Sequence, residues 1–528
     1  MTPFLRRFLP AIAAVLLFPA ASGAEAIFPV NDNTLAPGVF DQPAVVASGN
    51  ILHVAFVGDN TSGNLSNPDT RLYYAAVNGA ANFADKALER SQVILTPAVA
   101  IHNGSYTQAR HPQIAMRSAT QMVILFQAIP TAPPGITDSK LFRALITLEN
   151  NAVKTQLIDE IKDSSVVPLT GKLTDLSFGL VTTDNTLRVA YAEKNTGDVY
   201  YARVGLDNAL LVESPRLLTQ QPHTRGTAPL PRLRLDGTNR SHVVWAANND
   251  SAAPSGIYYA LVQQASPGSD NLAIGATEVL SGPNRWGFPS VLLTPSGYVL
   301  VLAADEPFGT AGIGGPLGVS LLNPRAVVQD GNPVNVGNLG ANASFFLYPP
   351  GMTVLPSNFD TYRPETAIDA QNRVFVAGYG YLGGPPFFQG TPGRYYGMGI
   401  SNVYTTVATI AGFAEMFSPP LPVGLGEIAF ATELPDDYTR PAFTLFSDKA
   451  IHFWSGPALS APGNGVRNLY ITTTASASIP PTAAAQSGCS AVDDPRRGES
   501  GRIPGALPLF LPAVLIALRR VARKAFAL

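Results

Sequence analysis

One recurring stretch decides the fold, and its first copy reads Pro43-Ala-Val-Val-Ala-Ser-Gly-Asn-Ile-Leu-His-Val-Ala-Phe-Val57, then Leu72-Tyr-Tyr-Ala-Ala-Val77 after a loop. It contains a proline, an apolar segment, a polar turn, a second apolar segment and a third segment with paired tyrosines. Segments rich in Val, Ile and Tyr that are bounded by Gly, Asn and Pro are typical of β-strands joined by tight turns. Each copy therefore predicts three successive strands.

Seven copies of this pattern follow one another, at a mean spacing of about 66 residues. Six begin with a proline, and the third, which includes Val199-Tyr-Tyr-Ala-Arg-Val204, lacks it. The spacing leaves room for a fourth strand in each copy, and a ring of such sheets has no long unpaired edges. The sequence therefore predicts an all-β, seven-bladed β-propeller over residues 25–473, closed by a strand from residues 26–40. Six or eight blades, or two packed β-sandwich domains, are the alternatives.

Both ends of the chain have the features of export and anchoring. Residues 1–24 combine Arg6 and Arg7 with a short apolar run and small residues, the pattern of a secretory signal peptide. Residues 474–488 are rich in Ala, Ser and Pro and are expected to form a linker. Residues 489–528 contain an apolar segment followed by a basic tail, which the positive-inside rule keeps in the cytoplasm. The body is therefore predicted to lie outside the cytoplasm, with a retained membrane anchor at either end as the alternative.

The chain has a single cysteine, Cys489, so an internal disulfide is not available to stabilise it. Around it the sequence reads Ser487-Gly-Cys-Ser490, then Asp493-Asp-Pro-Arg-Arg497, an apolar segment and Arg519-Arg520. This order resembles the cysteine-containing C-terminal sorting signals of bacteria, such as the MYXO-CTERM and JDVT-CTERM kinds, over about the last 40 residues. The resemblance implies cleavage near Cys489 by a membrane sorting protease and attachment of a lipid. It also implies display at the cell surface or outer membrane of a Gram-negative bacterium.

Composition and motifs narrow the class of function. A net charge of −2 with 14% charged residues lacks the basic footprint of a nucleic-acid-binding protein. No nucleophile elbow, phosphate loop or dinucleotide fingerprint occurs, so no cofactor is expected. His53, His242 and His452 recur at equivalent positions, as packing residues do, and the oxygen-rich residues 59–69 do not follow the EF-hand pattern. We expect no metal site, and a monomer.

Charged residues beside the strands indicate where a ligand could bind. In a propeller the first strand of each blade starts on the face where the second strand ends, so residues at these points share one funnel. The residues concerned are three arginines that precede repeat prolines and carboxylates that follow second strands: Arg110, Arg363, Arg440, Asp59, Glu193 and Asp305. Guanidinium groups suit carboxylate or phosphate, which makes these residues candidates for binding an anionic glycan. Alternatively, the same residues form ion pairs between neighbouring blades.

The arginines, together with repeats such as His242-Val-Val-Trp245 and Ile257-Tyr-Tyr-Ala260, resemble sialidase-like (BNR-type) propeller proteins. The Ser-x-Asp-x-Gly-x-Thr-Trp box of those repeats is absent. We interpret the chain as a surface-displayed, lipid- or membrane-anchored propeller that binds a glycan or a cell-surface protein, and we assign no catalytic residue. A sialidase-like glycoside hydrolase acting on anionic glycans through paired carboxylates is the alternative. A structural envelope protein without a discrete ligand is a third.

Overall fold

The computed structural model places the chain in two compact units, residues 1–480 and 481–528, and the residues it describes all belong to the first. They are 28–31, 38–59, 70–83, 85, 87–162, 173–193, 195–219, 225, 229–247, 256–266, 269–280, 286–293, 299–305, 317–322, 335–338, 360–368, 374–381, 394–400, 421–422, 428–429, 442–446, 449–457 and 467–475. The predicted signal peptide, nearly all of the linker and the C-terminal segment with Cys489 lie outside them.

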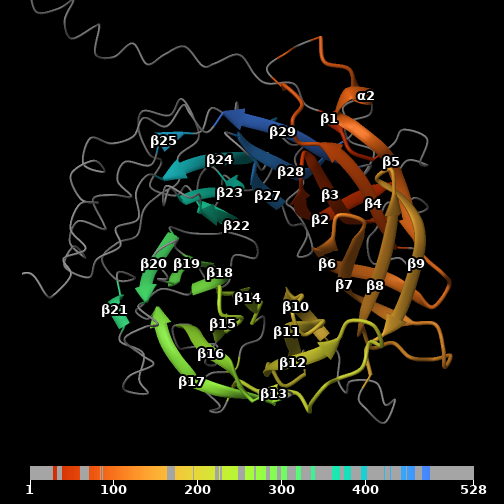
Figure 1. Cartoon of the computed structure of the whole chain (residues 1–528). Helices are drawn as coiled ribbons and strands as arrows, with labels where there is room; N and C mark the ends of the chain where they lie inside the picture. The colour runs from red at the N-terminus through yellow and green to blue at the C-terminus, as the bar shows by residue number, and fades with distance from the viewer. Residues whose placement is uncertain are drawn as a thin grey trace, which may run out of the picture. The chain divides into compact units, whose positions relative to one another are not determined.

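Strands pair antiparallel in chain order into groups that mostly contain four strands, and a parallel pair between Val39 and Arg467 joins the first and last groups into one sheet (Figure 1). The first sheet contains β2 (Val39–Ser48), β3 (Ile51–Asp59), β4 (Arg71–Asn78) and β5 (Ile94–Ile101). The second contains β6 (Tyr106–Ser118), β7 (Gln121–Pro130), β8 (Lys140–Glu149) and β9 (Ala152–Glu160). The third contains β10 (Leu173–Val181), β11 (Thr186–Glu193), β12 (Val199–Gly205) and β13 (Arg216–Leu217). The fourth contains β14 (Arg232–Leu235), β15 (Ser241–Ala247), β16 (Gly256–Ser266) and β17 (Ser269–Leu280).

The later sheets follow the same plan. One contains β18 (Trp286–Leu293), β19 (Val299–Asp305), β20 (Leu317–Leu322) and β21 (Asn335–Asn338). The next contains β22 (Asp360–Ile368), β23 (Val374–Tyr381) and β24 (Arg394–Ile400), with β25 (Leu421–Pro422) and β26 (Ile428–Ala429) both paired to β24. The last strands are β27 (Ala442–Phe446), β28 (Lys449–Pro457) and β29 (Arg467–Ala475).

The prediction of an all-β fold is confirmed, since the described residues form strands with one short helix, α2 (Arg90–Val93). Within the described residues, no helix is long and apolar enough to cross a membrane. The first strands touch in succession, from β2 through β6, β10, β14, β18 and β22 to β27, and β27 in turn contacts β2. Chain-order sheets packed in this way have the arrangement of a β-propeller, and their order differs from the Greek-key order of β-sandwiches.

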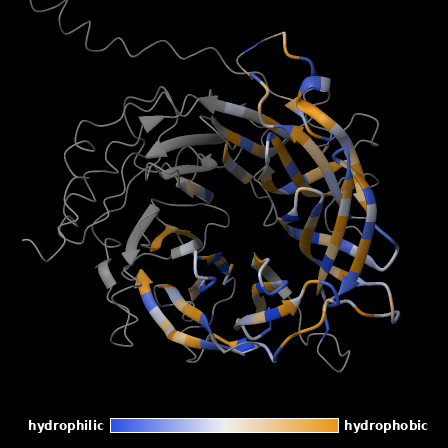
Figure 2. Cartoon of the chain, in the orientation of Figure 1, coloured by the Kyte–Doolittle hydropathy of each residue, from blue (hydrophilic) through white to orange (hydrophobic). Residues whose placement is uncertain are grey.

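Each hydrophobic core lies between two successive sheets. The paired tyrosines of β4 illustrate the arrangement, because Tyr73 packs into the core shared with β28 and β29, and Tyr74 packs into the core shared with β6 and β7. Both rings are buried, since alternation directs neighbouring side chains to opposite faces of a sheet and both faces are covered. Figure 2 accordingly shows hydrophobic residues along much of the strands of the first two sheets.

The N-terminal strand β1 (Phe28–Pro29) joins the last sheet by pairing antiparallel with β29. Next to it, the buried side chain of Asn31 donates to Asn468 Oδ1 at 2.9 Å and accepts the Leu469 N–H at 2.8 Å. Arg90 donates to the Pro29 carbonyl at 3.2 Å. The start and the end of the described chain are therefore held together by hydrogen bonds, as predicted for residues 26–40.

Replacing Asn31 with Ala should lower the free energy of unfolding by about 1–3 kcal/mol, because it leaves the buried Leu469 N–H without its acceptor. Urea unfolding of the full-length protein measures the change, with Asn50→Ala in the exposed β2–β3 turn as the control. Equal stability of the two variants would contradict this role of Asn31.

Candidate functional site

Repeat prolines interrupt the first strands of several sheets. The pairing of β2 with β3 shifts between Asp41 and Ala44, that of β6 with β7 between Arg110 and Gln113, and that of β22 with β23 between Tyr362 and Glu365. Proline has no N–H to donate to a neighbouring strand, so a bulge forms there.

The residue before the proline has a left-handed backbone in two of these bulges, with φ of 53° at Gln42 and 50° at His111. Leu230, before Pro231, shares this conformation at 46°. Such a conformation is uncommon outside glycine, and it redirects the side chains on either side of it. The bulges therefore interrupt the regular alternation of side chains between the two faces of the sheet in these first strands.

Side chains next to these prolines line a small pocket that is partly open to solvent. Its walls come from the first strands of four sheets. Gln42 and Pro43 lie on β2, Arg232 lies on β14 and Glu365 lies on β22, and β6 supplies His111, Pro112 and Gln113. These strands are the innermost of their sheets (Figure 1). We take this pocket as the candidate site.

Polar contacts link the walls of the pocket. Arg232 Nη2 lies 3.6 Å from Glu365 Oε1, which joins two sheets that are not consecutive in the chain. Gln42 Oε1 accepts the His111 N–H at 2.7 Å, which joins the first two sheets. The Gln42 side chain is only 2% exposed, and its buried Nε2 has no hydrogen-bond partner among the described residues. The pocket therefore contains a paired carboxylate and an amide donor that is not satisfied.

Three of the predicted site residues have described side chains, and none of them lines the pocket. Arg110 lies in the β6 bulge, one residue before His111. Asp59 is fully buried at the end of β3, opposite Val39 at the start of β2. Glu193 ends β11, where its carboxylate accepts the Thr196 hydroxyl at 3.2 Å.

The structure describes only the backbone of two other predicted residues, and it does not describe the remaining two. Asp305 pairs with Trp286 at the end of β19, and Arg363 lies within the β22 bulge. Arg440 and Cys489 lie outside the described residues. The sequence analysis missed Gln42, Gln113, Arg232 and Glu365, although all directly flank a repeat proline, as Arg363 and Arg440 do in the sequence.

The recurring histidines form buried pairs with tyrosines. His53 Nδ1 lies 2.8 Å from the Tyr74 hydroxyl, and His242 Nδ1 lies 2.9 Å from the Tyr259 hydroxyl. Burial lowers the pKa of His53 to about 4 and that of His452 to about 3. These histidines therefore pack as neutral core residues, and no group of three or more metal-binding side chains occurs in the described ranges.

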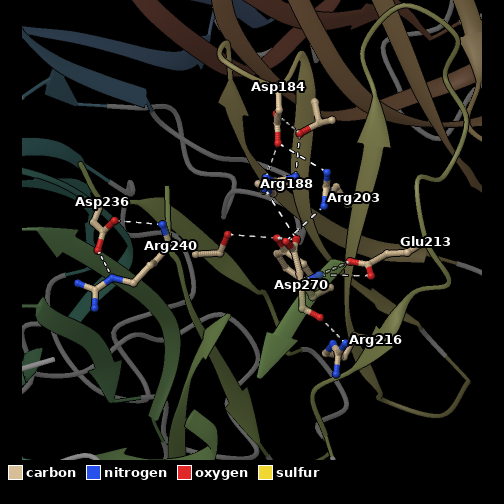
Figure 3. Close-up of polar contacts among 11 residues, drawn as sticks. Asp184, Arg188, Arg203, Glu213, Arg216, Asp236, Arg240 and Asp270 are labelled. Carbon is tan, nitrogen blue, oxygen red and sulfur yellow. Dashed lines mark hydrogen bonds and ion pairs between the residues drawn. The ribbon is translucent and has the colours of Figure 1, made fainter. Parts of the chain in front are cut away.

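A second polar cluster, which we call the Asp270 cluster, joins the third and fourth sheets (Figure 3). Arg188 and Arg203 lie directly opposite each other on β11 and β12, an arrangement that repels without a counter-charge. Arg188 Nη2 lies 2.7 Å from Asp184 Oδ2, and Arg203 Nη1 lies 3.5 Å from Asp270 Oδ1. The Tyr201 hydroxyl also donates to Asp270 Oδ2, at 2.7 Å. Two carboxylates thus neutralise two buried guanidinium groups.

The Asp270 cluster contains ion pairs between neighbouring sheets, formed by residues other than the arginines and carboxylates singled out in the sequence. Arg143 on β8 acts similarly, because it is fully buried and donates to Asp159 and to the carbonyl of Leu206, which directly follows β12 of the third sheet. The sequence signal that could have identified these buried arginines is the presence of a charged residue within an otherwise apolar strand. Their partners come from distant positions, and the sequence pattern did not identify them.

Replacing Asp270 with Ala should destabilise the protein by about 3–5 kcal/mol, because Arg188 and Arg203 would stay buried with one counter-charge fewer. Glu149→Ala removes an exposed carboxylate that pairs with Lys154 at 3.1 Å and should cost about 1 kcal/mol or less. Chemical denaturation of both variants measures the difference. Similar losses in the two would contradict a structural role for the Asp270 cluster.

No protein-family model and no curated protein matches the chain. Among solved structures, a protein of unknown function from Dyadobacter fermentans is 11% identical, with a TM-score of 0.43, over 85% of this chain and 97% of that one. Trypanosoma rangeli sialidase in complex with the inhibitor DANA is 8% identical, with a TM-score of 0.38, over 86% of this chain. This chain spans 58% of that sialidase. A GH43 endo-arabinanase from Bacillus licheniformis is 11% identical, with a TM-score of 0.30, over 56% of this chain and 97% of that one.

Proposed function

We propose that the first unit is a closed, seven-bladed β-propeller that binds a ligand in the pocket between its inner strands, without catalysis. Support for the blade number comes from the seven first strands that contact one another in succession and from β1, which pairs with β29. In such a ring the inner strands surround a central channel, where polar side chains from different blades meet. The convergence of Gln42, Gln113, Arg232 and Glu365 from separate strands is the observation that carries the proposal.

A glycan or a polar group on a surface protein is the ligand that we propose. The pocket offers hydrogen-bond donors and acceptors from several strands. Its carboxylate among the described lining residues, Glu365, lies 3.6 Å from Arg232 Nη2 and is therefore paired with a guanidinium group. We propose that these groups bind a ligand without turnover.

We keep the predicted arginines in this proposal because two of them occupy the same position in the repeat as residues that line the pocket. Arg363 and Arg440 directly precede repeat prolines, and so do Gln42 and His111, which line the pocket. Arg110 is one residue further from its proline. We propose that these arginines, with Glu193 and Asp305 around them, extend the binding surface beyond the pocket; Asp59, which is fully buried, is not part of it.

A glycan array probed with the full-length protein should identify bound glycans, and a fluorogenic sialoside assay should show no turnover. Arg363→Ala should weaken binding of the best glycan by about ten- to a hundredfold, since a charge-assisted contact is worth about 1.5–3 kcal/mol. Arg363→Lys should restore part of it, and Arg117→Ala in an exposed ion pair should have no effect. Rapid sialoside turnover would instead favour the glycosidase.

We further propose that the protein is exported, cut near Cys489, modified with a lipid there and displayed at the cell surface. The support is the signal-like sequence of residues 1–24 and the order of the cysteine, apolar segment and basic tail near the C-terminus. In a comparable lipid-anchor signal the C-terminal apolar segment is removed and a lipid is attached in its place. The mature protein is then anchored by the lipid and does not span the membrane.

Replacing Cys489 with Ala should abolish lipid attachment and release the protein from the cell surface, because the thiol is the proposed attachment site. Cell fractionation and labelling with a radioactive fatty acid measure both effects, with Ser487→Ala as the control. A Cys489 variant that is processed and retained like the unmodified protein would show that the cysteine is incidental.

A further inference from the structure

An arginine beside the pocket, Arg234, makes no hydrogen bond or ion pair with any described residue. It lies on β14 two residues after Arg232, so alternation places the two side chains on the same face of the strand. Leu233 and Leu235 take the other face, where Leu233 is buried and Leu235 packs against Gly179 of the third sheet. The strand thus directs its two arginines away from the hydrophobic core and toward the side where Glu365 lies.

Arg234 is exposed to solvent, yet protein surrounds it, and this burial lowers the pKa of its guanidinium. A side chain that projects into a narrow, water-filled channel would likewise be both exposed to solvent and surrounded by protein. Glu365 raises the pKa of Arg234 and Arg232 lowers it, so all three charges act on one another. A guanidinium keeps its proton at physiological pH. Among the described residues, two positive charges and one carboxylate therefore lie on this side of β14.

A second observation at the same pocket indicates a missing acceptor. Gln42 presents an amide whose oxygen is engaged by the His111 N–H and whose buried nitrogen has no partner in the described part of the chain. A buried donor without an acceptor costs about 1–3 kcal/mol. An oxygen-rich ligand in the pocket would accept from this amide and from the guanidinium groups together.

We propose that this pocket binds the oxyanion of its ligand, a carboxylate, sulfate or phosphate, through Arg234 and Arg232, with Gln42 as an additional donor. This inference rests on the proposed function, because it names the chemical class of the ligand at the same site. Glu365 occupies the Arg232 side of the site as an internal anion, 3.6 Å away, and competes with the ligand for that arginine. The arginines concerned are therefore those of β14, in addition to any that precede the repeat prolines.

Affinities of the full-length protein for four probes test this proposal by calorimetry: galacturonate, galactose, inorganic sulfate and inorganic phosphate. We expect galacturonate to bind at least tenfold more tightly than galactose, with an affinity that falls as salt is added. Comparison of galacturonate with sulfate and phosphate shows whether the site prefers the carboxylate of a sugar, a sulfate or a phosphate.

Two variants with opposite expected effects separate loss of binding from loss of folding. Arg234→Gln should abolish the preference for galacturonate, and Glu365→Gln should strengthen binding of every anion several-fold by removing the competing carboxylate. Arg117→Gln, which removes an equal charge in an exposed pair with Asp207, should behave like the unmodified protein. A folding defect cannot produce tighter binding, so the Glu365 variant gives an independent result.

The outcomes distinguish this inference from the function on which it rests. Equal affinity for galactose and galacturonate would overturn the anion site and leave glycan binding in place. Saturable binding of sulfate or phosphate that Arg234→Gln removes would support the anion site, even where neither sugar nor the glycan array shows binding and the glycan proposal fails. Absence of saturable binding by all three anions, or weaker anion binding by the Glu365 variant, would overturn the inference.

Discussion

Burial of both faces of the first four sheets shows the constraint on which the rest of this structure depends. A sheet with one apolar face can pack against a single partner, but the sheets described here place tyrosines such as Tyr73 and Tyr74 into different cores on opposite sides. Each sheet therefore needs a neighbour on either side, and the series ends only when the last sheet meets the first. Contacts between β27 and β2, and the pairing of β1 with β29, supply that junction.

Polar and charged side chains are consequently confined to a few places. Some lie between sheets, where the charges of Arg188 and Arg203 are balanced by Asp184 and Asp270 and the cost of burying them is reduced. Others lie at the inner strands, where the repeat prolines prevent regular pairing and the bulges free side chains from the hydrophobic cores. The same residue type thus holds blades together in one place and remains available to solvent in another. Arg188 is buried and paired, whereas Arg234 is exposed and has no partner among the described residues.

The sequence allowed the sheets to be predicted because their signals are local. Alternating apolar residues, a turn and two adjacent tyrosines specify strands wherever they occur, and the repetition of the pattern indicated many similar sheets. The pocket could not be predicted in the same way, since it depends on the backbone at each proline. The left-handed residue at His111 interrupts the alternation of β6, where three successive residues, from His111 to Gln113, line the pocket. Partners such as Arg232 and Glu365 are brought together only by the order of the sheets in space, which no short stretch of sequence specifies.

The seam between β1 and β29 also has a consequence for the time course of folding. Asn31 and Leu469, which are hydrogen-bonded at this seam, are separated by 438 positions in the chain. Synthesis at 5–20 residues per second puts roughly 20–90 s between the appearance of the two partners. Throughout that interval β1 has no strand to pair with, while the intervening sheets can already form from neighbouring segments. The seam therefore cannot form before nearly all of the first unit has been synthesised.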